Sequence, residues 1–440
     1  MSLARRLASQ SFIIFAARIF GAGFIFVAQA LIARFWGAGI LGEFLLVVAS
    51  VNLVSVVMPL GYHTVGTYFA AEYRAKGQRE QMIAFLLRSY GFVALSFAGL
   101  VLVGPLVLDA FGLGQGAVGM HFVPFALLTL GTAIVYVNSA ALIGLKRPFA
   151  GFFADTLLRP MIVLGAFLLA LGSGIADVGF TQMLWMIGVG YVIVSAVQFA
   201  FVLQSVPEIA PSSEPEAPQA RRWWRFAMPW VVISLATDFF FDIDLLLLSH
   251  LLTREELAIF GVCTRMFSLA SFGVAAVYAV TMPDIFESEA KADRVTFNRK
   301  VGEANVVASL VAILVFTGTV FGAPFALMLF GPEFSAGAVP LAVLCLSLVV
   351  RSAAGPASIV LSIHDRPWAS LPAIGLGLAT LFGCNLLLVP QMGLIGAAIA
   401  AVVAISVWSL ALWLTALHMA KLDVSILQWF RSRRALFAAE

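Results

Sequence analysis

Residues 12–35 have the sequence FIIFAARIFGAGFIFVAQALIARF, a run of 24 residues in which only Arg18 and Arg34 carry a charge. A helix of about 20 apolar residues crosses the roughly 30 Å hydrocarbon core of a bilayer. The run is too long for the apolar part of a signal peptide, and no small-residue cleavage site follows it. It therefore predicts a retained first membrane span.

Similar apolar runs fill the rest of the chain, which is 62% hydrophobic and 11% charged. Soluble domains have about 45–50% apolar and about 25% charged residues. Strands of a membrane barrel would alternate over about ten residues, whereas these runs are longer and unbroken, as in helices. The predicted spans are Phe12–Phe35, Leu41–Ala70, Met82–Phe111, Phe122–Leu145, Phe149–Leu171, Phe180–Leu203, Phe226–His250, Leu257–Met282, Val301–Phe321, Ala338–Ile363, Trp368–Val389 and Leu394–Leu417.

The basic residues predict the orientation of these twelve spans. Twenty of the 26 lysines and arginines fall in the loops and span ends on one side, Arg254 alone falls on the other, and five lie within spans. Cytoplasmic loops carry an excess of lysine and arginine. We therefore expect a multi-pass membrane protein with both termini in the cytoplasm.

A Pro/Ser/Glu stretch at 206–218 separates two sets of six spans. Met58-Pro59 and Met282-Pro283 end corresponding spans of the two sets, which indicates a parallel repeat with a cleft between its halves. The predicted regions are an N-lobe at 1–204, a cytoplasmic linker at 205–225, a C-lobe at 226–420 and a cytoplasmic amphipathic tail at 421–440. The tail is expected to lie at the headgroup surface.

Four short patterns occur in a fixed order along these spans. They are LIARFWG at 31–37, DIDLLLL at 242–248 with EELAIFGVCTR at 255–265, LFGPEF at 329–334 and VPQMGLIGAA at 389–398. The set resembles the polysaccharide exporter branch of the multidrug/oligosaccharidyl-lipid/polysaccharide (MOP) superfamily, which includes repeat-unit flippases for O-antigen and exopolysaccharide. This chain has Phe260-Gly261 where that family more often has Gly-Tyr.

The resemblance implies a MATE-like fold, with two six-helix lobes around a central cavity that opens alternately to each side. It also implies a location, the bacterial inner membrane, and a substrate, an undecaprenyl-diphosphate-linked oligosaccharide moved across that membrane for cell-surface polysaccharide synthesis. The implied partners are this lipid-linked substrate, membrane lipids, and polymerase or chain-length proteins of the same pathway.

Arginines inside spans are the first candidates for substrate binding. A charged side chain in hydrocarbon costs about 2.5–3.5 kcal/mol on insertion scales, so such residues usually line water or a substrate path. The planar guanidinium donates two hydrogen bonds to a phosphate and stays charged when partly buried. Arg18 and Gln29, eleven residues apart, share a helix face. The predicted cavity and diphosphate-binding residues are Arg18, Gln29, Arg34, Arg159, Arg265 and Arg351.

Other interpretations of two of these arginines stay open. Arg159 and Asp155 are one helical turn apart and would neutralise each other, which gives Arg159 a structural role. Arg34 would anchor its helix by reaching the headgroups.

Acidic residues inside spans are candidates for ion coupling, and these are Asp155, Asp238 and Asp242. Asp238 and Asp242 lie one turn apart on one helix face, where repulsion would favour uptake of a proton or sodium ion. They would equally serve as counter-ions for the arginines. We expect Asp244 near the outer headgroups.

The sequence has no enzyme or cofactor signature. The three cysteines form no Cys-x-x-Cys pair, the five histidines have no ligand spacing, and there is no phosphate-binding P-loop. We therefore expect no metal, no cofactor, no catalytic residue and no nucleic-acid partner.

Several other functions remain open. A cation-extruding multidrug antiporter of the same superfamily would need an acidic cavity, whereas the first span carries arginines and no acid. A lipid II flippase would usually have two more helices. A membrane-embedded glycosyltransferase or polymerase would have large outer loops, whereas the predicted outer loops of this chain are short. An inert scaffold is a further alternative.

Overall fold

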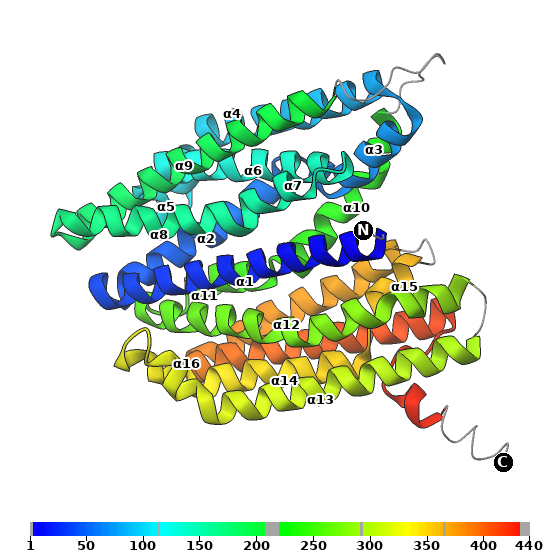
Figure 1. Ribbon diagram of the computed structural model, residues 1–440. Helices are drawn as coiled ribbons and strands as arrows, with labels where there is room; N and C mark the ends of the chain where they lie inside the picture. Colours follow the sequence, from blue (N-terminus) through cyan, green and yellow to red (C-terminus); the bar gives the residue numbers. More distant parts are fainter. Residues whose placement is uncertain (1–2, 113, 207–219, 291–293, 364–366, 432–440) are drawn as a thin grey trace. The chain divides into compact units, whose positions relative to one another are not determined.

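The computed structural model describes residues 3–112, 114–206, 220–290, 294–363 and 367–431, and the regular elements in these ranges are all helical. Most of the predicted linker at 205–225 and the end of the predicted tail at 421–440 lie outside these residues. The chain divides into two compact units, Met1–Ile243 and Asp244–Glu440. Within each unit the long helices run side by side (Figure 1).

The first unit contains the N-terminal helices. They are α1 Leu3–Trp36, α2 Ala38–Val57, α3 Tyr62–Lys76, α4 Arg79–Ala110, α5 Ala117–Met120, α6 Phe122–Gly144, α7 Pro148–Phe153, α8 Arg159–Ala170, α9 Ala176–Ser205, α10 Ala220–Asp238 and the start of α11 Phe240–Leu248.

The second unit contains the end of α11 and the remaining helices. They are α12 Arg254–Ala290, α13 Arg294–Leu327, α14 Ala338–Ala354, α15 Ala357–Ile363 and α16 Leu371–Thr415.

Ten segments of the described residues are long and apolar enough to cross a membrane. One of them, Trp368–Met419, contains both the eleventh and the twelfth predicted spans. The seventh predicted span, Phe226–His250, is absent from the ten because it is divided between α10 and α11. The prediction of an all-helical, multi-span membrane protein is thus confirmed, and the orientation of the termini stays a prediction.

Proline and glycine explain where predicted spans break. The second span is divided into α2 and α3 after Pro59, where Leu60 and Gly61 have positive φ values of 48° and 79°. The tenth span is divided at Gly355, with φ 81°, and Gly393, with φ 54°, interrupts α16 between the last two spans. At each of these positions the backbone leaves the helical conformation and the chain turns.

Helix α10 packs against α3, which explains why it belongs to the first unit. Trp223 of α10 is buried among Tyr62, Phe69, Tyr73 and Phe85. Its Nε1 donates a hydrogen bond of 2.5 Å to the hydroxyl of Tyr73. The boundary between the units therefore falls in α11, on the C-terminal side of the predicted linker at 205–225.

The described part of the C-terminal tail, up to residue 431, packs against the second unit, and its expected position at the headgroup surface stays a prediction. The carbonyl of Val424 accepts a hydrogen bond of 2.6 Å from Asn305 Nδ2, and the Ile426 N–H donates to the carbonyl of Ala353 at 2.9 Å. Gly355 leaves room for this segment, because a Cβ there would overlap the Val424 carbonyl. Asp423 is buried and pairs with Arg431 at 2.7 Å.

Candidate functional site

A buried arginine lies in the middle of the first unit. Arg159, at the start of α8, is 8% exposed and forms an ion pair with Asp155. Its Nη2 donates to Thr132 Oγ1 of α6 at 3.1 Å. Its Cζ lies 4.5 Å from the ring centroid of Tyr191 of α9 and 5.9 Å from that of Tyr136 of α6. Three helices thus hold one guanidinium.

A π-helical turn at Ala154–Leu158 brings Asp155 and Arg159 together. Pro160 has no N–H and therefore donates no hydrogen bond to the carbonyl of Thr156. The N–H of the preceding residue, Arg159, bonds to the carbonyl of Ala154, five residues back, as in a π-helix. Asp155 keeps 44% of its side chain exposed. The predicted alternative, in which these two residues neutralise each other, agrees with this contact.

The cluster around Arg159 still has unused hydrogen-bonding capacity. Arg159 Nε is buried without a hydrogen-bond partner, and so is Nδ1 of His63. The His63 ring stacks on Tyr136, with 5.7 Å between centroids. Sequence reasoning did not single out His63, because a lone histidine in an apolar run gives no spacing signal.

The other predicted residues of the first unit are more dispersed. Arg18 is exposed, with its Cζ 5.3 Å from the ring centroid of Phe152, and Arg34 is also exposed. Gln29 is 2% exposed, and its Oε1 is buried without a donor. The predicted shared face therefore changes from exposed at Arg18 to buried at Gln29.

The predicted acidic pair is divided by a helix break. Asp238 ends α10 and is exposed, whereas Asp242 in α11 is buried and accepts a hydrogen bond of 3.1 Å from Asn52 Nδ2. Because the helix is interrupted at Phe239, spacing by four residues no longer defines a common face.

Asp244 was expected near the outer headgroups, and the structure corrects this. Its side chain is completely buried in the second unit, where Asn385 Nδ2 of α16 donates to Asp244 Oδ1 at 2.7 Å. Asp244 Oδ2 and Asn385 Oδ1 are both buried without a donor. A proton or a small cation bound by the Asp244 carboxyl would satisfy both of these acceptors. The one signal for this pair in the sequence is the isolated Asn385 within an apolar span.

Arg265 and Arg351 also lie in the second unit. Arg265 is half-buried in α12, and Arg351 is exposed near the end of α14, where its charge acts on Tyr278. Within the described residues, no group of three His, Cys, Asp or Glu side chains could hold a metal ion.

The fold resembles that of known membrane transporters. An inward-facing multidrug resistance MATE transporter of the MOP superfamily superimposes with a TM-score of 0.71, at 14% identity over 95% of each chain. The lipid II flippase MurJ, in an inward closed conformation, gives 0.67 at 14% identity over 97% of this chain and 92% of MurJ. A MOP-superfamily transporter from Pyrococcus furiosus gives 0.57 at 15% identity over 96% of each chain.

Sequence comparison adds nothing to this, since no protein-family model and no curated protein matches the chain. Assignment to the polysaccharide exporter branch therefore stays a prediction. The protein has the all-helical, multi-span fold of MOP-superfamily membrane transporters.

Proposed function

We propose that the protein is a flippase that moves undecaprenyl-diphosphate-linked oligosaccharides from the cytoplasmic to the periplasmic leaflet of a bacterial inner membrane. The observation that carries the proposal is the charge of α1. The candidate span in this helix, Ala16–Trp36, has two exposed arginines, Arg18 and Arg34, and no acidic residue. The cargo would thus be anionic.

The position of Arg18 supports this inference. Arg34 lies two residues before the end of α1 and can reach headgroups. Arg18 lies 16 residues earlier, about 24 Å along the helix axis. It is the third residue of the candidate span Ala16–Trp36, at the opposite end from Arg34. At that end the diphosphate of a lipid-linked substrate in the cytoplasmic leaflet would supply paired acceptors for its guanidinium.

The structural neighbours are compatible with an anionic substrate and with a cationic one. MurJ is a flippase for lipid II, and the Pyrococcus furiosus transporter is described as having a binding pocket of reverse polarity that suggests a different function. The neighbours are transporters, not enzymes, which supports transport over glycosyl transfer in this chain.

A second candidate function is a cation antiporter, and the buried Asp244–Asn385 pair favours it. The same pair is also compatible with a flippase, since a proton or monovalent cation bound there would couple transport to an ion gradient. We assign Asp244 this coupling role in place of Asp238, which is exposed.

Two phenotypes of a strain that lacks this chain separate the candidates. A flippase predicts loss of surface polysaccharide, together with accumulation of its lipid-linked repeat unit and unchanged drug susceptibility. Restoration by the wild type and by Arg254→Ala, an exposed arginine in a predicted outer loop, but not by Arg18→Ala, supports the flippase. Normal polysaccharide with increased susceptibility to cationic drugs contradicts it and supports the antiporter.

A further inference from the structure

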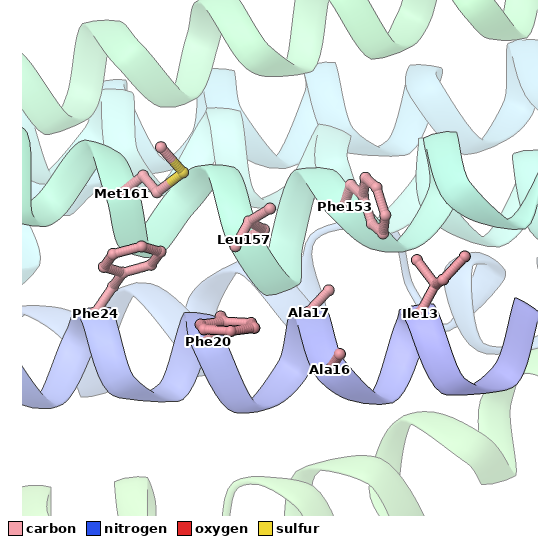
Figure 2. Close-up of a pocket in the computed structure, with 8 residues that line it drawn as sticks. All are labelled: Ile13, Ala16, Ala17, Phe20, Phe24, Phe153, Leu157 and Met161. Carbon is pink, nitrogen blue, oxygen red and sulfur yellow. The ribbon is translucent and has the colours of Figure 1, made fainter. Parts of the chain in front are cut away.

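An apolar groove runs along α1 where this helix meets α7 and α8. It has a volume of about 440 Å³. One wall consists of Ile13, Phe20 and Phe24 of α1, and the other consists of Phe153, Leu157 and Met161 (Figure 2). Ala16 and Ala17 lie on the α1 wall between Phe20 and Ile13, where their small side chains leave space (Figure 2). None of the lining side chains is polar.

The groove exists because two backbones touch at its base. A Cβ at Gly21 of α1 would overlap the carbonyl of Thr156, so the absence of a side chain lets the two backbones meet. Thr156 lies in the π-helical turn before Pro160. On either side of this contact, phenylalanine and methionine side chains stand away from the backbones and form the walls.

A cation lies at the edge of this groove. Arg18 belongs to the same turns of α1 as Ala17 and Phe20, and its guanidinium lies over Phe152, next to the groove residue Phe153. Among the described residues Arg18 makes no ion pair, so its charge is free to bind an anion.

A second groove in the same unit provides a contrast. It lies between α8 and α9, has a volume of about 510 Å³ and is lined by apolar residues that include Gly165, Leu169 and Trp185. The arginine of α8, Arg159, is buried and paired with Asp155. This groove would accept apolar chains of any kind and has nothing to select a charged headgroup.

We infer that the groove along α1 binds the isoprenoid chain of a polyprenyl diphosphate, with Arg18 contacting the diphosphate. The inference rests on the proposed function and adds a location for the lipid part of the substrate. All groove residues except Ile13 lie in the candidate spans Ala16–Trp36 and Pro148–Ala170, so the isoprenoid chain would stay at membrane depth while the diphosphate meets the guanidinium. A few units of a branched isoprenoid chain would pack between the aromatic rings and the small alanines, with methyl groups filling the spaces beside the alanines.

Photolabelling of the full chain in lipid nanodiscs tests this location. The probe is undecaprenyl diphosphate with a diazirine in its isoprenoid chain, and the comparison probe is phosphatidylglycerol with a diazirine in an acyl chain. Labelled peptides are mapped by mass spectrometry, and total saturable binding of undecaprenyl diphosphate is measured in parallel. The variants are Ala16→Trp, which fills the groove, Arg18→Ala, and Gly165→Trp, which fills the second groove as the matched control.

We expect the isoprenoid probe to label 13–24 and 153–161 of the wild type. Arg18→Ala should lower this label about tenfold, as loss of a charge-assisted contact would. Ala16→Trp should abolish it, and Gly165→Trp should leave it unchanged. Since Arg18 is exposed, its variant remains informative even if Ala16→Trp does not fold.

Three outcomes overturn the inference. Saturable binding with the label elsewhere rejects the groove but leaves the proposed function standing. Equal labelling of the groove by phosphatidylglycerol identifies it as an ordinary lipid contact. Absence of any saturable binding of undecaprenyl diphosphate rejects the groove and the proposed function together.

Discussion

Arg159 and Arg18 are two arginines within spans of the same unit, and they differ in burial and in charge pairing. Arg159 is buried, paired with Asp155, bonded to Thr132 and stacked on Tyr191. Arg18 is exposed, and its one described interaction is with the ring of Phe152. The carboxylate of Asp155 compensates the charge of Arg159, whereas no described residue compensates the charge of Arg18. An arginine in a membrane span therefore points to a substrate only where the protein leaves its charge uncompensated.

The largest expected effect is the loss of stability on changing Arg159 to alanine. Breaking a buried ion pair by removing one partner costs about 3–5 kcal/mol, and we expect the lower end, about 3 kcal/mol, because Asp155 is 44% exposed and so is not fully buried. Thermal unfolding of the purified protein in detergent measures this loss. The double variant Arg159→Met with Asp155→Asn should recover part of it, and a single variant as stable as the wild type would place Arg159 in the same class as Arg18.

The contact between α1 and the π-helical turn joins the helices of the two arginines. Gly21→Ala should destabilise the first unit by about 2 kcal/mol, because the new methyl group overlaps the Thr156 carbonyl and the helices must move apart. Gly23→Ala is the matched control, since nothing lies within 4 Å of its Cβ position. That change should stabilise α1 by up to about 1 kcal/mol through helix propensity. Unfolding midpoints of the two variants that move in the same direction would contradict the close approach.

The smallest expected effect comes from an ion pair outside the spans. Its arginine, Arg222, provides a third environment to compare with those of Arg159 and Arg18. Arg222 of α10 bonds to Glu72 of α3 at 2.9 Å, and Lys76 bonds to the same carboxylate at 2.5 Å. Burial alone would raise the pKa of Glu72, but the hydrogen bonds and charges of Arg222 and Lys76 outweigh it and hold that pKa below its usual value. Such partly exposed pairs contribute up to about 1 kcal/mol.

The lowered pKa fixes the sign of the pH dependence. The contribution of Glu72 is fully present above the unfolded glutamate pKa of about 4.3 and is lost as the pH falls through this value and then through the lower folded pKa. Glu72→Gln should therefore be less stable than the wild type near pH 7, and the difference should shrink towards pH 3, within about 1 kcal/mol overall. A difference that grows with acidity in unfolding experiments would contradict the assignment.

The length of the apolar runs predicted the helical, multi-span fold. The charged residues inside these runs identified the arginines as candidates for function. Each predicted span from Phe12–Phe35 onward contains helical residues. Bilayer thickness imposes these lengths directly, so they are visible in one sequence. Part of the Arg159 environment was visible too, because Asp155 lies one turn away on the same helix.

The partners that lie far away in the sequence were not predictable. Asp244 was expected at the outer surface, yet Asn385, 141 residues later, holds it in the interior. Thr132 and Tyr191 reach Arg159 from two other helices. Hydrophobic periodicity says which residues avoid water but not which helix lies opposite each of them.

The helix breaks were only partly visible. Pro59 lies in the second predicted span and Pro160 in the fifth, and the chain bends near both. The break at Phe239 has no proline or glycine. It lies between α10, which packs against α3, and α11. A turn of this kind depends on tertiary packing, which local sequence does not record.

Transport by proteoliposomes tests the central claim most directly. Purified wild type, Arg18→Ala and Arg254→Ala are reconstituted with a fluorescent undecaprenyl-diphosphate oligosaccharide, and the fraction that becomes accessible to an external quencher is followed with time. The account predicts rapid movement by the wild type and by Arg254→Ala, and a loss of about tenfold or more in Arg18→Ala, which should unfold at the same temperature as the wild type. Equal rates for all three proteins, or no movement above empty liposomes by a folded wild type, would contradict it.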